Sequence, residues 1–160
     1  MPTRLECLAA AGLASALAMF SAPAAADMLT YTNSRFGTSV RFPAELFSER
    51  MEPPQNGDGM TWTAPDGGSL AVYAFNNALD VTPEGLADES AGRDDVKITY
   101  RRIGKNWAVL SGFEDGLIFY QRFEFGKEGV IHSMLLKYPE SERGTYDAVT
   151  GPMADSLDGP

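Results

Sequence analysis

His132 is the only histidine in this 160-residue sequence, so it alone could supply an imidazole base or ligand. It falls in a β-favouring run over 130–138, where neighbouring side chains point to opposite faces of a strand. Ser133 therefore cannot be its nucleophile, and a Ser-His-acid triad would need another serine, such as Ser69 or Ser111. Neither serine sits in an elbow motif. We expect His132 to be a buried structural residue; the alternative is a small hydrolase that uses it.

Acidic residues occur as adjacent pairs at 88–89, 94–95 and 114–115. Neighbouring side chains diverge in strands and turns, so we expect these pairs to be solvated surface groups. The Asn-Gly-Asp-Gly loop at 56–59 lacks the spaced ligands and closing glutamate of a calcium loop. A zinc site would have to rely on carboxylates, because one histidine and one cysteine, Cys7, are present. The sequence therefore predicts no metal, no cofactor and no catalytic residue.

Basic side chains inside the long C-terminal strands provide the candidate binding site. Arg122 and Lys137 are expected on one face of the sheet, together with Trp107 and Tyr120. Cations beside aromatic rings can hold an anionic or aromatic ligand, so these four residues predict a ligand groove. The alternative is that the basic side chains lie over apolar surface and pair with nearby acids.

The N-terminus has the three parts of a secretion signal. Arg4 precedes an uncharged apolar run over 8–20, and small residues follow that run. Ala24 and Ala26 have the A-x-A arrangement of a signal-peptidase site, which predicts cleavage before Asp27. The apolar run is too short for a membrane-spanning helix, which takes about 20 residues. The sequence therefore predicts a cleaved signal peptide over 1–26 and an exported, periplasmic protein with no transmembrane segment in its mature form.

The mature chain, 27–160, is expected to form one acidic domain. The signal carries one positive and one negative charge, so the net charge of −9 is unchanged by its removal. A field of that sign repels nucleic acid and anionic membranes, which leaves an unknown envelope protein or a small ligand as the partner. The mature chain has no cysteine, so its stability has to come from packing.

The hydrophobic pattern predicts mostly strands. We expect strands over 29–33, 38–42, 60–64, 69–75, 96–102, 107–113, 117–125 and 130–138. Thr82 and Pro83 predict the start of a short helix that extends to 90. A second helical pattern follows Pro139, and Pro152 predicts a kink there or two short helices. The fold class is therefore α+β: an antiparallel meander with helices packed on its faces.

Two tight turns predict the register of the last three strands. Asp115-Gly116 has the composition of a two-residue hairpin loop. If Lys127-Glu128 is the next two-residue loop, Phe123 lies opposite His132. One face then gathers the expected main core, which consists of Ala108, Leu110, Leu117, Phe119, Phe123, Phe125, Val130, Met134, Leu136 and Tyr138. The other face would be partly covered by the C-terminal helix.

The order of these elements resembles a known fold group. The pattern consists of Tyr31, the Phe-Gly-Thr-Ser-Val run at 36–40, Phe42-Pro43, a strand with Trp62, a helix, a four-strand meander, and Tyr138-Pro139 before a closing helix. It resembles that of the PsbP-like (Mog-type) α/β/α sandwich. The chain is most similar to the exported bacterial branch of that group. These are packing and turn residues, so the resemblance implies a fold and no catalytic residue.

Known members of that fold group act as accessory or binding proteins, and the resemblance implies such a role here. The sequence and this resemblance therefore predict a non-enzymatic extracytoplasmic binding or accessory module of unknown ligand. The alternatives are a small periplasmic hydrolase that uses His132, and an envelope structural protein, which would expose a large apolar patch.

Overall fold

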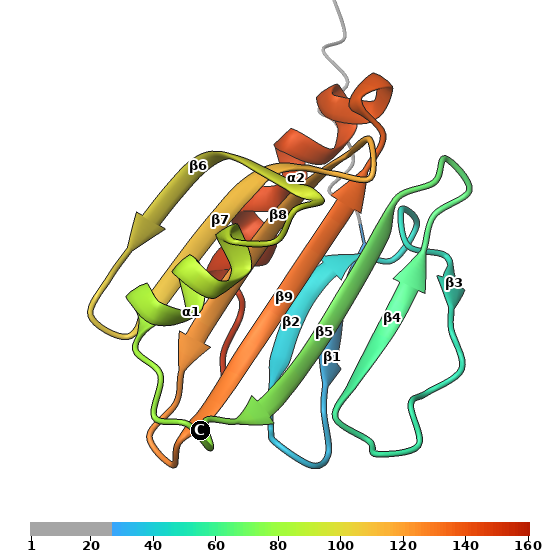
Figure 1. Cartoon of the computed structure of the whole chain (residues 1–160). Helices are drawn as coiled ribbons and strands as arrows, with labels where there is room; N and C mark the ends of the chain where they lie inside the picture. Colours follow the sequence, from blue (N-terminus) through green and yellow to red (C-terminus); the bar gives the residue numbers. More distant parts are fainter. Residues whose placement is uncertain (1–26) are drawn as a thin grey trace, which may run out of the picture.

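The structure is a computed structural model that describes residues 27–160, so the predicted signal peptide lies outside the described residues. A seven-stranded antiparallel sheet forms the middle layer, and α1 lies on one face of it (Figure 1). The β1–β2 hairpin and α2 lie on the other face. The elements are β1 (Met28–Thr32), β2 (Ser39–Pro43), β3 (Glu49–Arg50), β4 (Gly59–Thr63), β5 (Ser69–Asn76), α1 (Pro83–Ala91), β6 (Val96–Ile103), β7 (Trp107–Glu114), β8 (Leu117–Phe125), β9 (Val130–Tyr138), a 3₁₀ turn (Glu140–Glu142) and α2 (Arg143–Asp155).

The large sheet has the strand order β3-β4-β5-β9-β8-β7-β6. The meander β6-β7-β8-β9 forms one half, and β5 joins it by pairing with β9. The strand β5 therefore lies in the interior of the sheet, where its apolar residues on both faces predict it to be. The architecture confirms the predicted α+β class. We call the two sides of the sheet the α1 face and the α2 face.

Local chemistry explains the helix boundaries. Thr82 accepts a hydrogen bond from the Gly85 N–H at 3.1 Å, and Pro83 occupies the first turn, as predicted. The helix α2 continues through Pro152 as one helix rather than as two short ones. Its buried side chains, Tyr146 and Met153 among them, hold it against the sheet and compensate for the missing proline donor. Neither described helix is long and apolar enough to cross a membrane.

The β7–β8 turn has the predicted register. Asp115 and Gly116 both have positive φ, 52° and 80°, which is the backbone of a two-residue type I′ loop. Gly112 accordingly lies opposite Phe119.

The β8–β9 turn differs from the prediction by one residue. The Gly126 N–H donates to the Val130 carbonyl at 2.8 Å, so the loop has three residues and ends in Gly129, with φ of 70°. Phe123 therefore lies opposite Ser133 instead of His132. Because side chains alternate along a strand, this shift moves every β9 side chain to the face opposite the predicted one.

The register shift divides the predicted core between two faces. The larger core lies on the α2 face, where Met134, Leu136 and Tyr138 meet Phe42, Trp62 and residues of α2. The smaller core lies on the α1 face, where Leu86 and Ala87 meet a set of strand residues, namely Ala108, Leu110, Phe119, Phe123 and Ile131. The C-terminal helix therefore covers the larger core, whereas the sequence predicted that it would partly cover the face opposite the main core.

Candidate functional site

Three of the four residues of the predicted groove lie on one face of the sheet. Trp107 on β7 and Arg122 and Tyr120 on β8 all project from the α2 face, on the half of the sheet that ends at β6. The Arg122 guanidinium carbon lies 5.4 Å from the centre of the Trp107 ring, a cation–π geometry. Arg122 also donates from Nε to a Glu124 carboxylate oxygen at 2.9 Å. The structure therefore brings these three side chains together on a partly exposed surface.

Lys137, the fourth residue, lies on the opposite face, and its predicted position was wrong. It pairs with Phe119 in the sheet, and its Nζ lies 2.6 Å from a carboxylate oxygen of Glu114. The cause is the three-residue loop before β9, which reverses the facing of that whole strand. Lys137 therefore contributes nothing to the surface that contains Trp107.

The edge strand β6 supplies two residues that the sequence prediction missed. Tyr100 lies opposite Ser111 and Arg102 opposite Val109, which places both on the α2 face, Tyr100 towards Tyr120 and Arg102 towards Trp107. Simple alternation would put Lys97 and Arg101 on one face. A β-bulge between Ile98 and Tyr100 separates them instead.

Arg101 consequently points to the α1 face, where it forms an ion pair with Asp88 of α1 at 2.6 Å. Lys97 lies opposite Phe113 on the α2 face. We refer to one set of side chains as the β6–β8 surface: Lys97, Tyr100, Arg102, Trp107, Tyr120 and Arg122.

The charges of the β6–β8 surface are only partly balanced. Arg122 is paired with Glu124, whereas Lys97 and Arg102 form no ion pair with any described residue. Burial raises the pKa of Tyr120, and the nearby Arg122 opposes that shift. The indole of Trp107 lies over Gly104, where an added Cβ would collide with the ring. The surface thus presents unneutralised cations beside aromatic rings that are already held in place.

His132 is buried on the α2 face, with 1% of its surface exposed. Its Nδ1 lies 2.7 Å from the Thr38 hydroxyl oxygen, and its Nε2 has no hydrogen-bond partner among the described residues. Burial lowers the pKa of His132, and Pro160, Asp158 and Glu124 oppose that shift. The prediction that His132 is buried is confirmed, although Thr38 was not foreseen as its partner. Within residues 27–160, no serine or carboxylate forms a hydrogen bond with His132, so the geometry gives no support to a hydrolase.

Glu114 departs from the expectation of solvated acids. It is 7% exposed at the end of β7, where Arg93 and Lys137 both form ion pairs with it. Carboxylate oxygens of Asp95, Glu114 and Asp115 lie within 4.8 Å of one another. Two cations already neutralise the central carboxylate, and Arg93 lowers the pKa of Asp95 through a hydrogen bond. We interpret the cluster as an ion-pair network that ties the α1–β6 connection to β7 and β9.

The comparisons with known proteins establish the fold. No protein-family model matches the sequence, and no curated protein matches it. The solution structure of cyanobacterial PsbP (CyanoP) from Synechocystis sp. PCC 6803 superposes with a TM-score of 0.59 and 13% identity, over 90% of this chain and 99% of that one. A crystal structure from Bacteroides thetaiotaomicron gives a TM-score of 0.47 and 15% identity, over 84% of this chain and 48% of the other. The similarity to CyanoP shows that this chain has the PsbP-like fold.

Proposed function

We propose that residues 27–160 form a non-enzymatic, extracytoplasmic binding or accessory module. We further propose that the chain is an exported bacterial member of the PsbP-like (Mog-type) group, with a signal peptide over 1–26 and a periplasmic mature form. The A-x-A site after an uncharged run supports export. The PsbP-like fold is compatible with an accessory role, but a fold does not determine a function.

The β6–β8 surface is the proposed ligand site. One observation carries this proposal: Arg102, without an acidic partner among the described residues, lies diagonally across from Trp107 on the α2 face of a chain of net charge −9, and the unpaired Lys97 lies further along the same face. Cations that no described acid neutralises can hold an external anion, and the neighbouring aromatic rings can add stacking or cation–π contacts. An acidic envelope protein and a small anionic or aromatic ligand both fit this chemistry.

Capture from an envelope extract tests the proposed site. The wild-type protein, Arg102→Glu and Lys127→Glu would each be immobilised and exposed to the same extract. Lys127 is an exposed cation in the β8–β9 loop, so its reversal changes the net charge equally and serves as the matched control. We expect a component that is retained by wild type and Lys127→Glu, and lost with Arg102→Glu. Equal retention by all three variants would contradict the proposed site.

Processing tests the proposed location separately. N-terminal sequencing of the protein recovered from the periplasm is expected to begin at Asp27. Recovery of a chain that still begins at Met1 would contradict export.

A further inference from the structure

The α1 face of the sheet is only partly covered. The helix α1 packs on β6 and β7, and in Figure 1 the strands β9, β5 and β4 carry no helix on this side. Side chains of these strands on the α1 face, such as Ala71, Tyr73 and Leu135, are partly exposed. Their neighbours on the α2 face, such as Val72 and Met134, are fully buried. The half of the α1 face that β4, β5 and β9 form is therefore open to solvent, and we call it the open floor.

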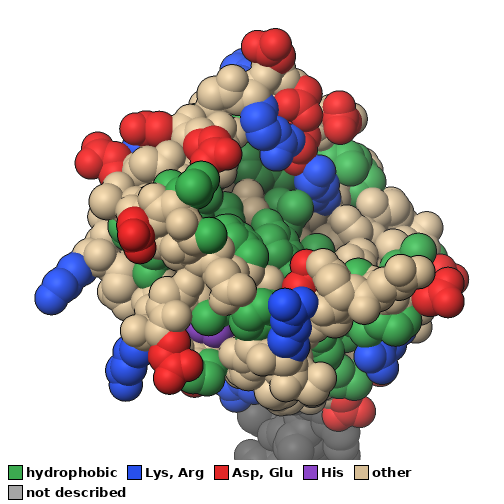
Figure 2. All heavy atoms as spheres, turned by 60° about the horizontal axis from the view of Figure 1, so that its bottom comes forward, with side chains coloured by type: hydrophobic (Ala, Val, Ile, Leu, Met, Phe, Trp, Pro, Cys, Tyr) green, Lys and Arg blue, Asp and Glu red, His purple; other side chains and the backbone are tan. Residues whose placement is uncertain are grey.

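Two hollows flank an aromatic pair on this floor. The rings of Tyr73 and Phe75 on β5 are stacked, with centroids 6.2 Å apart and planes 22° apart. A hollow of about 350 Å³ reaches Tyr73 from the β3–β4 side, and one of about 380 Å³ reaches Phe75 from the α1 side. Figure 2 shows the centre of this face hollowed and floored by hydrophobic side chains. Each hollow is large enough for an apolar side chain or a small ligand.

Buried polar groups hold the floor in place. Gln121 on β8 donates from Nε2 to the Tyr73 hydroxyl oxygen at 2.7 Å, and it also contacts the Ser133 hydroxyl at 3.4 Å. Gln121 and Ser133 are both buried. The aromatic pair is thus fixed before any partner arrives, which reduces the entropy that binding would cost.

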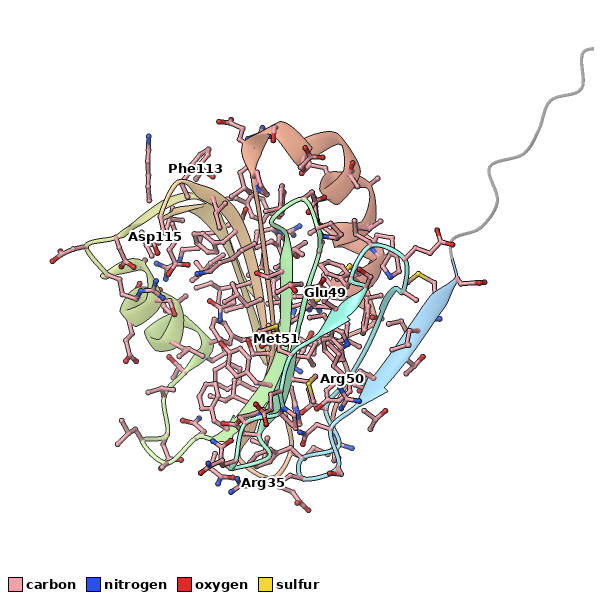
Figure 3. The ribbon with its side chains drawn as sticks, turned by 90° about the vertical axis from the view of Figure 1, so that its right-hand side faces the viewer. Arg35, Glu49, Arg50, Met51, Phe113 and Asp115 are labelled. Atoms are coloured by element: carbon pink, nitrogen blue, oxygen red, sulfur yellow. The ribbon has the colours of Figure 1, made fainter. Side chains whose placement is uncertain are left out.

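The rims of both hollows are apolar and acidic. Met51 is 48% exposed beside the first hollow, and Leu79 is 85% exposed beside the second. Figure 3 views the sheet from its β3 edge, where Met51 lies at the front and α1 stands on one side. Glu52 and Asp58 line the first hollow and Glu89 lines the second, whereas no lysine or arginine of the described residues lines either one.

We propose that this floor is a docking site for a basic, apolar segment of a partner protein. Two apolar side chains of that segment enter the hollows on either side of Tyr73 and Phe75, and adjacent lysines or arginines meet Glu52, Asp58 and Glu89. The choice of occupant follows from charge: a second copy of this chain and an anionic membrane both carry the sign that the acidic rims repel. The site lies on the face opposite the β6–β8 surface and does not depend on it.

Three synthetic peptides test the proposal by fluorescence anisotropy with the full chain. The first carries two leucines flanked by lysines, the second replaces the lysines by glutamates, and the third replaces the leucines by serines. We expect the lysine–leucine peptide to bind, and each of the other two to bind at least about tenfold more weakly, a difference of about 1.4 kcal/mol. Equal binding by the lysine–serine peptide would overturn the proposal, since charge alone would then suffice.

Variants of the protein test whether the peptide binds at the proposed site. Leu79→Asp and Glu89→Lys change exposed side chains at the second hollow, so both should fold normally and bind the lysine–leucine peptide several-fold more weakly. Glu128→Lys, an equal charge change in the β8–β9 loop, is the matched control and should bind as wild type does. Arg102→Glu should also bind normally, which separates this site from the β6–β8 surface.

Three outcomes would overturn the proposal. Unchanged peptide affinity in Leu79→Asp and Glu89→Lys would place the peptide elsewhere. Binding of Nile red that Leu79→Asp weakens, without peptide binding, would assign the hollows to a small apolar ligand. Dimerisation in sedimentation experiments that Leu79→Asp abolishes would assign the face to a second copy of this chain.

Discussion

The two faces of the sheet differ most clearly along β9. Leu136 points to the α2 face and is fully buried beneath Trp62 and Tyr146 and their neighbours, whereas Leu135 points to the α1 face and is partly exposed. The β1–β2 hairpin and α2 cover the α2 face over β4, β5 and β9, and leave its β6 end exposed. The α1 face has one helix of nine residues over half its width. Over β5 and β9, stability is therefore concentrated on the α2 face, and the α1 face is left available for binding.

Hydrogen bonds reinforce the cover of the α2 face. Tyr138 and Tyr146 stack with centroids 4.6 Å apart, and their hydroxyls donate to Asp147 and Asp66 at 2.8 and 2.7 Å. Burial raises the pKa of both phenols far above the ordinary value, so both stay neutral. The cover on this face is thus fixed by directional contacts as well as by apolar area, which explains why α2 can tolerate Pro152.

The largest expected effect comes from truncating neighbours on the two faces of β9. Leu136→Ala removes a fully buried side chain and should lower the free energy of unfolding by about 2–5 kcal/mol. Leu135→Ala should lower it by only about 1 kcal/mol, because the site is partly open and leaves no closed cavity. Urea unfolding of both variants measures the difference. Equal losses would mean that the two faces are packed alike.

A smaller effect is expected at Gly112, where the sheet meets the β6 bulge. A Cβ added there would collide with the backbone of Lys97 and Ile98, although Gly112 lies opposite Phe119. Gly112→Ala should therefore lower the free energy of unfolding by about 1–3 kcal/mol. Replacing Phe119 by Leu should not restore this loss, because the obstacle is backbone, which cannot move aside as a side chain can. Thermal melts of the two single variants and the double variant decide this. Rescue by Phe119→Leu would show that the ring is the obstacle.

The sequence could predict the β7–β8 turn but not the turn after β8. Asp115-Gly116 fits a two-residue loop in which both residues have positive φ. Gly-Lys-Glu-Gly, at 126–129, is compatible with a two-residue or a three-residue loop, and the chain adopts the three-residue loop with Gly129 at positive φ. That single residue determined which face His132 and Lys137 occupy, and with them the composition of the core.

The candidate site could also be predicted from the sequence only in part. Trp107, Tyr120 and Arg122 could be grouped from the sequence because one unambiguous turn connects their strands. Tyr100 and Arg102 could not be added, since a bulge inside β6 has no reliable sequence signal. The open floor beside α1 was also invisible, because strand patterns do not reveal how far a short helix extends over a sheet.

Glu114→Gln tests whether the α1 face depends on polar contacts where its apolar core is small. The change keeps the shape and removes the charge that Arg93 and Lys137 share. Both cations are partly exposed and can be solvated, so we expect a loss of about 1 kcal/mol in the free energy of unfolding. Glu128→Gln, at an exposed residue of the β8–β9 loop away from the cluster, is the control and should leave stability unchanged. Urea unfolding at low and high salt measures both, and a neutral Glu114→Gln would contradict the role of the network.

The smallest expected effect is a pH dependence located on the α2 face, at His132. Burial holds the pKa of the folded form below the ordinary 6.5, so the unfolded chain takes up a proton first as the pH falls. His132 therefore favours the folded state above about pH 6.5, and this contribution is lost as the pH falls through the lowered pKa, with a slope of at most about 1.4 kcal/mol per pH unit. His132→Gln removes the titration and keeps a side chain that can bond to Thr38. Melting temperatures between pH 7.5 and 5.5 should thus fall less in the variant than in wild type. Identical slopes would mean that the pKa of His132 is the same in the folded and the unfolded chain, and hence that the α2 face is more open to water at His132 than its packing shows.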